Sequence, residues 1–282
     1  MQTSESSATE NTELQDLRIV VSSCDLYCDM WPLYFHFLDK YWKDAPTPIY
    51  LISNHLSYDD PRVVTVKVGD DKSWTDGIAR AMPEIPAEYV LFMLDDFMLT
   101  EAPDFERLAR VATELKDNGG DWVCLRPKAE PPEDTPDALI SPLTDAAQSA
   151  GFHAGIWRTQ YLQKLCANVH LNIWHTEGHI RKVIRSGAAG NLFYLTHNGT
   201  GILSYIEVVK RFWRKEGMDF VTQEGVKPDL NRRPFPPQGD NVFSRFVRSI
   251  LKRYVRYMAV RQKQDAIKNH GGKISATVEL IK

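Results

Sequence analysis

The sequence predicts an α/β fold built on a mainly parallel sheet flanked by helices, and three observations support this prediction. Short strand-like segments alternate with helical patterns between residues 18 and 125, which is typical of parallel sheets. The segment Tyr89–Leu94 is apolar throughout, as in a strand buried on both faces. The chain has 282 residues, of which 43% are hydrophobic, so it can bury a sizeable core.

The first half of the chain supplies most of the expected sheet. We expect strands at 18–23, 49–53, 63–68, 89–94 and 122–125. We expect helices at 27–42, 73–82 and 104–116, with Ser73 as the N-cap of the second. Each helix connects two strands, so the connections should be right-handed crossovers.

The second half changes in character after Arg126. Residues 127–150 contain five prolines and several acids and should form a long loop over the sheet. Beyond the loop, we expect a short strand or turn at 151–157 and a strand at 191–196. The patterns also predict helices at 161–166, 172–185 and 202–216, the last ended by Gly217.

The chain divides into four parts by composition. Residues 1–16 are rich in Ser, Thr and Glu and should be a disordered lead without a signal sequence. Residues 17–226 form the main domain, and 227–240 form a proline-rich linker. Residues 241–282 form a basic amphipathic helix and tail, whose segment 242–260 fits an anionic membrane surface or a helix packed on the domain with solvated cations.

Charge and cysteine content exclude several classes of protein. The formal net charge is −3, which gives no overall case for nucleic-acid binding. The four cysteines include no CxxC pair, so reduced thiols in a cytoplasmic protein are expected. No apolar run reaches the roughly 18–20 residues that span a bilayer. We therefore expect a cytoplasmic protein, either free or peripheral on the inner face of the membrane.

Two adjacent acids, Asp95 and Asp96, directly follow the buried strand. Ionised carboxylates in apolar surroundings are costly, and two together repel each other. The pair is best tolerated where the strand ends and the acids face a cation or a ribose hydroxyl. In open α/β sheets the ends of the strands are also where ligands bind.

The order of several motifs resembles that of bacterial GT-A-type glycosyltransferases that build cell-surface polysaccharides. The resemblance covers about 18–217, and its motifs are Ser22-Ser-Cys-Asp25, Tyr41-Trp42, Ser73-Trp74, Leu94-Asp-Asp-Phe97, Gly155-Ile-Trp157 and Trp174-His-Thr-Glu177. It implies a GT-A-like, Rossmann-type sheet with a C-terminal helical extension. A nucleotide-binding half would span 17–125 and an acceptor half 126–226.

The resemblance also implies a nucleotide-sugar donor and a saccharide or lipid-linked acceptor. The expected donor-binding residues are Ser23, Asp25, Asn54, Asp76, Arg80, Asp95 and Asp96. A divalent cation, Mn²⁺ or Mg²⁺, would be held by Asp96 and His197. The family's usual motif is Asp-x-Asp whereas here the acids are adjacent, so metal-independent binding also stays open.

Glu177 is the expected catalytic residue, as the general base of an inverting transfer. It follows Trp174 by three residues, so both side chains share one face of the expected helix. The acceptor would be bound by His153, Trp157 and Trp174, because indole and imidazole rings can contact a sugar by stacking and hydrogen bonding.

Two other functions remain open. A non-catalytic carbohydrate-binding or scaffold protein on the same fold would also explain the adjacent acids. A nucleotidyltransferase is the second and less favoured function. It should carry a glycine-rich, basic loop after the first strand, and Ser22–Asp25 has neither glycine nor lysine. A dinucleotide-binding oxidoreductase is disfavoured because no G-x-G-x-x-G follows that strand.

Overall fold

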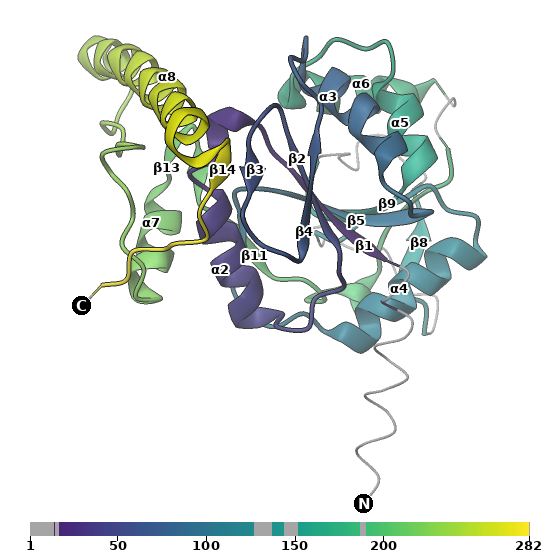
Figure 1. The fold of residues 1–282 in the computed structure, drawn as a ribbon. Helices are drawn as coiled ribbons and strands as arrows, with labels where there is room; N and C mark the ends of the chain where they lie inside the picture. The colour runs from purple at the N-terminus through teal and green to yellow at the C-terminus, as the bar shows by residue number, and fades with distance from the viewer. Residues whose placement is uncertain (1–13, 15–16, 127–136, 144–151, 187–189, 282) are drawn as a thin grey trace, which may run out of the picture.

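A central sheet of eight strands organises the computed structural model, which describes residues 14, 17–126, 137–143, 152–186 and 190–281. The strand order is β4-β2-β1-β5-β9-β7-β10-β8 (Figure 1). The strands are β1 (Arg18–Ser22), β2 (Ile49–Ser53), β4 (Val63–Lys67), β5 (Tyr89–Leu94), β7 (Trp122–Cys124), β8 (Ile140–Pro142), β9 (Gly155–Arg158) and β10 (Leu192–Leu195). β9 runs antiparallel to β5 and β7, and β8 runs antiparallel to β10. The other neighbouring pairs are parallel, which confirms the predicted α/β fold with a mainly parallel sheet.

The path of the chain places a topological switch point beside β1. From β1 the chain builds outward through β2 and β4, and then returns to add β5 on the other side of β1. The connections that leave the carboxyl ends of β1 and β5 therefore diverge. In open α/β sheets this divergence leaves a crevice where ligands bind.

Helices cover both faces of the sheet. α2 (Trp31–Tyr41) and α4 (Phe105–Asp117) pack on one face, and α3 (Trp74–Ala81), α5 (Thr159–Cys166) and α6 (Ile173–Arg185) pack on the other (Figure 1). Along β1, Ile19 and Val21 belong to the first core and Val20 to the second, because side chains alternate across a strand. Both cores thus fix the position of β1 and of its carboxyl end.

The helix starts follow capping rules. The Ser73 side chain accepts a hydrogen bond from the Asp76 N–H at 3.2 Å, which confirms Ser73 as the N-cap of α3. Asp104 and Asn172 cap α4 and α6 in the same way. The helix predicted at 27–42 starts later than expected: residues Asp25–Tyr27 form the 3₁₀ helix η1, and α2 begins at Trp31.

The prediction of a helix at 202–216 is wrong. This segment contains β11 (Tyr205–Glu207), β12 (Val209–Lys210) and β13 (Phe212–Trp213), followed by α7 (Lys215–Gln223). β11 pairs antiparallel with β6 (Phe97–Leu99), and Arg211, at a φ of 71°, turns the hairpin between β12 and β13. Apolar spacing is ambiguous in a short segment, and pairing with β6 satisfies the backbone groups of β11.

Gly217 does not end a helix but lies inside α7, where the helix touches the β11–β12 connection. A Cβ at this position would lie 2.4 Å from the Val208 Cα and 2.6 Å from the Val208 carbonyl oxygen. Both atoms belong to the backbone, so neither can swing away.

We expect Gly217→Ala to lower the free energy of unfolding by about 1–3 kcal/mol, because the methyl group forces α7 away from Val208. Urea denaturation measures the change. Gly178→Ala is the matched control: Gly178 also lies in a helix, and no atom lies within 4 Å of its added Cβ, so this variant should be neutral or slightly stabilising. Equal stability of Gly217→Ala and wild type would contradict the close approach.

The segment expected as a linker, 227–240, is anchored to the main domain by two buried arginines. Arg233 is 1% exposed, and its guanidinium donates to the Asp29 carboxylate at 2.6 and 2.9 Å. Arg232 donates to the carbonyls of Leu26 and Val255 at 2.9 and 3.0 Å. The long helix α8 (Val242–His270) follows, and then β14 (Lys273–Ile274) pairs with β3 (Ser57–Tyr58).

Two expectations fall outside the described residues. The disordered lead at 1–16 does so apart from Leu14, and the loop at 127–150 does so apart from residues 137–143. In the described part of the chain, no helix combines the length and hydrophobicity needed to span a bilayer.

Candidate functional site

A cavity of about 540 Å³ lies at the carboxyl ends of β1, β2, β4 and β5, at the switch point of the sheet. Its volume is typical of small-molecule sites. The strand ends contribute Ser22, Ser23, Ile52, Asn54, Val68, Leu94 and Asp95. α6 and the β11–β12 segment contribute further residues, including Trp174, Glu177, Glu207 and Lys210.

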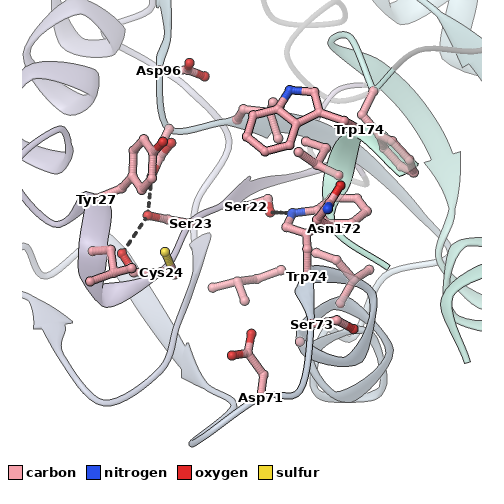
Figure 2. A pocket seen from close by; sticks show the side chains of 18 of the residues that line it. Ser22, Ser23, Cys24, Tyr27, Asp71, Ser73, Trp74, Asp96, Asn172 and Trp174 are labelled. Atoms are coloured by element: carbon pink, nitrogen blue, oxygen red, sulfur yellow. Dashed lines mark hydrogen bonds between the residues drawn. The ribbon is translucent and has the colours of Figure 1, made fainter. Parts of the chain in front are cut away.

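The cavity is elongated, with acidic groups toward both ends. Figure 2 shows Asp71 at one end and Asp96 with Trp174 at the other. Ser23 lies between them, with Tyr27 beside it.

Asp95 is buried, and its hydrogen bonds fasten β5 to β1. It is 6% exposed, and its carboxylate accepts a hydrogen bond from the Ser23 hydroxyl. The Trp31 indole N–H donates to the same Ser23 oxygen at 2.6 Å. Burial raises the pKa of Asp95 well above its usual range, and the nearby Asp96 carboxylate raises it further. Asp95 therefore holds the two strand ends together at the switch point.

Asp96 is half-buried and lines the cavity beside a second acid, Glu207. Burial and the Glu207 carboxylate raise the pKa of Asp96 to about 7. The Asp96 carbonyl accepts a hydrogen bond from the Val208 N–H at 3.0 Å, so the backbone of the two acids is connected. Glu207 forms an ion pair with Arg214 at 2.5 Å.

The raised pKa of Asp96 should make stability depend on pH. Ionisation of Asp96 costs more in the folded than in the unfolded protein, so this contribution to stability is fully present below about pH 4 and is lost as pH rises through about 7. Asn cannot ionise. We therefore expect the Tm of Asp96→Asn minus the Tm of wild type to be larger at pH 8 than at pH 4, by several degrees. Thermal denaturation at both pH values measures this, and an unchanged difference between the two proteins would contradict the assigned pKa.

The structure brings seven of the expected site residues into the cavity and leaves five outside its lining. Those inside are Ser23, Asn54, Asp95, Asp96, His153, Trp174 and Glu177. Those outside are Asp25, Asp76, Arg80, Trp157 and His197.

Asp25 lies just behind the cavity wall, where its carboxylate is used by the protein itself. It accepts hydrogen bonds from the Ser53 hydroxyl at 2.8 Å and from the N–H groups of His55 and Leu56 at 3.0 and 3.1 Å. Lys263 of α8 pairs with it at 2.7 Å. These contacts give Asp25 a structural role, joining η1, β2 and α8.

Of the other four residues outside the cavity, Asp76, Arg80 and Trp157 make contacts within the protein. Asp76 and Arg80 form an ion pair at 2.7 Å on α3, and Arg80 donates to the Val68 and Asp70 carbonyls, which fixes the loop after β4. Trp157 is 1% exposed and stacks on Phe152 in the core, so its indole has no access to a saccharide. His197 lies in the 3₁₀ helix η3 (His197–Gly199) after β10.

His153 lines the cavity and has a lowered pKa. Burial and the positive charge of Arg126, whose Nη1 lies 3.3 Å from the ring, hold this pKa below its usual value. The imidazole is therefore neutral at pH 7 and can both donate and accept a hydrogen bond.

Sequence reasoning missed several residues that line the cavity: Asp71, Trp74, Asn172, Glu207 and Lys210. Asp71 was detectable, because it follows the third parallel strand just as Asn54 follows the second. Glu207 and Lys210 were hidden by the assignment of their segment to a helix. Trp74 donates its indole N–H to the Ser22 hydroxyl at 3.0 Å, a contact between distant parts of the chain.

The carboxylates at one end of the cavity fit a cation shared with a ligand. Among the described residues, no cluster of three His, Cys, Asp or Glu side chains forms a complete metal cage. Mg²⁺ is commonly bound by one or two carboxylates and completes its shell with water and substrate phosphates. Asp96 and Glu207, whose mutual repulsion raises the pKa of Asp96, match that mode.

No protein-family model matches this sequence, and no curated protein sequence matches it. Among solved structures, TarS 1–349 of S. aureus in complex with UDP-GlcNAc is similar over 90% of this chain and 76% of its own, at 13% identity and a TM-score of 0.42. The chain spans 40% of a longer TarS structure, with a TM-score of 0.40 and 13% identity. A CMP:2-keto-3-deoxy-manno-octonic acid synthetase complexed with CTP is similar over 68% of this chain and 93% of its own, at 11% identity and a TM-score of 0.36. Scores this low do not assign a site, so the functional case rests on the cavity.

Proposed function

We propose that this protein is a glycosyltransferase that moves a sugar from a nucleotide-sugar donor to a saccharide acceptor. The observation that carries the proposal is the cavity at the switch point, which is lined by Asp96, Glu207, Trp174 and Glu177. Figure 2 shows Asp96 and Trp174 toward the same end of this cavity. Such a cavity can hold a long, partly charged ligand. The end with Asp96 and Glu207 can hold the bond between the sugar and the diphosphate that breaks in the transfer.

The donor's nucleoside would lie over the ends of β1, β2 and β4. There Asp71 can accept a hydrogen bond from a base N–H, while Tyr27 supplies an aromatic wall beside Ser23, farther along the cavity toward Asp96 (Figure 2). Asn54 supports the same corner, because its side chain accepts from the Asp25 N–H at 3.2 Å and donates to the Gly69 carbonyl at 3.0 Å. The diphosphate would then reach Asp96 and Lys210.

The acceptor would enter beside α6. The Trp174 side chain is 50% exposed at the cavity edge, where it can stack on a sugar ring. Glu177 lies almost one helical turn later on the same face and also lines the cavity. His153 can hydrogen-bond a hydroxyl of the bound saccharide.

The reaction proposed for these groups is a single displacement with inversion. The Glu177 carboxylate accepts the proton of the acceptor hydroxyl as its oxygen bonds to the anomeric carbon. The bond from that carbon to the diphosphate breaks, and its electron pair stays on the diphosphate. Lys210, together with Mn²⁺ or Mg²⁺ held at Asp96, would stabilise that charge.

The proposed acceptor is a surface glycan or a lipid-linked saccharide, and the proposed location is cytoplasmic. A non-catalytic carbohydrate-binding protein would use the same cavity without turnover. Binding and turnover measurements on the same ligands therefore separate the two functions.

A thermal-shift screen with UDP-, GDP-, CMP- and dTDP-sugars, with and without Mn²⁺, tests the proposal. A ligand that binds only the native state raises Tm by mass action, by an amount set by its concentration relative to Kd. We expect at least one nucleotide sugar to raise Tm, and the free sugar to have no effect. Release of the nucleotide by a stabilising donor supports catalysis, and stabilisation without release supports the scaffold. Absence of any shift with these nucleotide sugars would contradict the proposed transfer.

A further inference from the structure

The helix α8 is apolar on two opposite sides, and in the part of the chain that the structure describes one side is buried and the other is exposed. On the inner side, Val255, Ala259 and Ala266 are buried, and Lys263 pairs with Asp25 of η1. Positions at multiples of about 3.6 residues share a face, so these side chains define one side of the helix. The packed side explains how α8 is held on the domain.

The other side carries an outer stripe, which we define as Phe243, Phe246, Ile250 and Tyr257. These side chains are 71%, 62%, 50% and 60% exposed. Their spacing of three, four and seven residues places them on one face, nearly opposite to Val255 and Ala259. Figure 1 shows α8 along the outside of the molecule, with its N-terminal end away from the sheet. A row of large exposed apolar side chains on one face of a helix is typical of an interaction site.

The charge of α8 indicates what covers this stripe. Between residues 242 and 264 there is no aspartate or glutamate, and the cations are Arg245, Arg248, Lys252, Arg253, Arg256, Arg261 and Lys263. Arg248 pairs with Asp240 at 2.9 Å and Lys263 pairs with Asp25, whereas Arg245, Arg253 and Arg256 are exposed. The exposed surface of α8 is therefore both apolar and strongly positive.

We propose that the outer stripe and the flanking arginines of α8 bind an anionic lipid bilayer, with α8 lying in the membrane interface. Aromatic side chains enter the headgroup and acyl boundary, while long arginine side chains reach the phosphates. Each basic residue near an anionic surface contributes about fivefold to binding, equivalent to roughly 1 kcal/mol. A second copy of the chain fits less well, because a two-fold contact would press this positive face against itself.

The membrane proposal is independent of the proposed sugar transfer, although the two are compatible. Lys263 and Arg232 tie α8 and its flanking segment to η1, whose Leu26 and Tyr27 line the cavity. A bilayer bound to α8 would therefore lie close to an element of the cavity wall.

Vesicle flotation of the full chain tests the proposal, with vesicles that contain phosphatidylglycerol compared with vesicles of phosphatidylcholine alone. We expect binding to the anionic vesicles that weakens with added salt. Arg253→Glu with Arg256→Glu should weaken binding at least about twentyfold. Phe246→Ser with Tyr257→Ser should weaken it about tenfold or more. Circular dichroism checks that each variant is folded.

Matched controls use exposed residues elsewhere. Lys43→Glu with Lys116→Glu makes the same change in net charge, and Leu280→Ser removes an exposed leucine that is not part of α8. Both should bind within about twofold of wild type. Three results would overturn the proposal: no flotation of wild type, equal loss in the controls, or a wild-type dimer that Phe246→Ser dissociates. None of these measurements requires a nucleotide sugar, so their failure is distinguishable from failure of the proposed transfer.

Discussion

Glu177→Gln should lower kcat by about 10²–10⁴-fold while leaving the Kd for the donor within about twofold of wild type. The amide keeps the size of the side chain and its place at the cavity edge, but it cannot accept a proton from the acceptor hydroxyl. Only the step in which that hydroxyl attacks should therefore suffer. Steady-state transfer and donor binding, measured on the same preparation, separate the two effects.

The control for this variant is Glu106→Gln, which makes the same chemical change at an exposed position of α4. Its kcat should equal that of wild type. If Glu177→Gln also turns over normally, Glu177 is not the base, and the proton must go to another acceptor. Retention of anomeric configuration in the product would remove the same role, because a retaining transfer does not need this base.

Asp96→Asn should weaken donor binding by about 10–100-fold and abolish any stimulation by Mn²⁺. A neutral amide is a poor ligand for a hard cation, and the diphosphate would lose the charge that the cation supplies. Asn also keeps the backbone contact with Val208, so the local fold should persist. Calorimetric titration of the donor with and without Mn²⁺ measures both effects.

Asp117→Asn, at the exposed end of α4, is the control for the loss of one acidic charge. It should bind the donor as wild type does. If Asp96→Asn keeps the full Mn²⁺ effect, Asp96 is not a metal ligand. If neither protein responds to Mn²⁺ and both bind the donor equally, binding is independent of metal, and Lys210 becomes the main group that faces the diphosphate.

Much of the fold follows from local features of the sequence. The continuous apolar run Tyr89–Leu94 predicted a strand buried on both faces, and β5 lies in the centre of the sheet. Ser73 predicted the start of α3, because a side-chain acceptor before a helical pattern satisfies an otherwise unpaired N–H. These signals are local, and the sequence carries them directly.

The errors have a physical cause in contacts between distant residues. The segment at 202–216 forms strands because β11 pairs with β6, about one hundred residues earlier. Gly217 is needed inside α7 because Val208 lies against it, and no local pattern reveals that contact. Arg232 and Arg233 lie in the segment expected as a proline-rich linker, and both are buried around Asp29, a contact that no local pattern reveals.

The candidate site was predictable where it depends on strand ends. Ser23, Asn54, Asp95 and Asp96 all follow parallel strands, and the sheet brings them to one edge. Asp25 follows the same rule in sequence, but its carboxylate points to Ser53 and Lys263 instead. The direction of a side chain after a strand depends on the turn that follows, and residue spacing does not determine it.

A crystal structure of the protein with the nucleotide sugar that stabilises it most would show directly whether the cavity is the donor site. We expect the nucleoside over the ends of β1, β2 and β4, the diphosphate next to Asp96, and the sugar between Asp96 and Glu177. A bound nucleotide sugar elsewhere on the molecule, with the cavity empty of ligand, would contradict this placement.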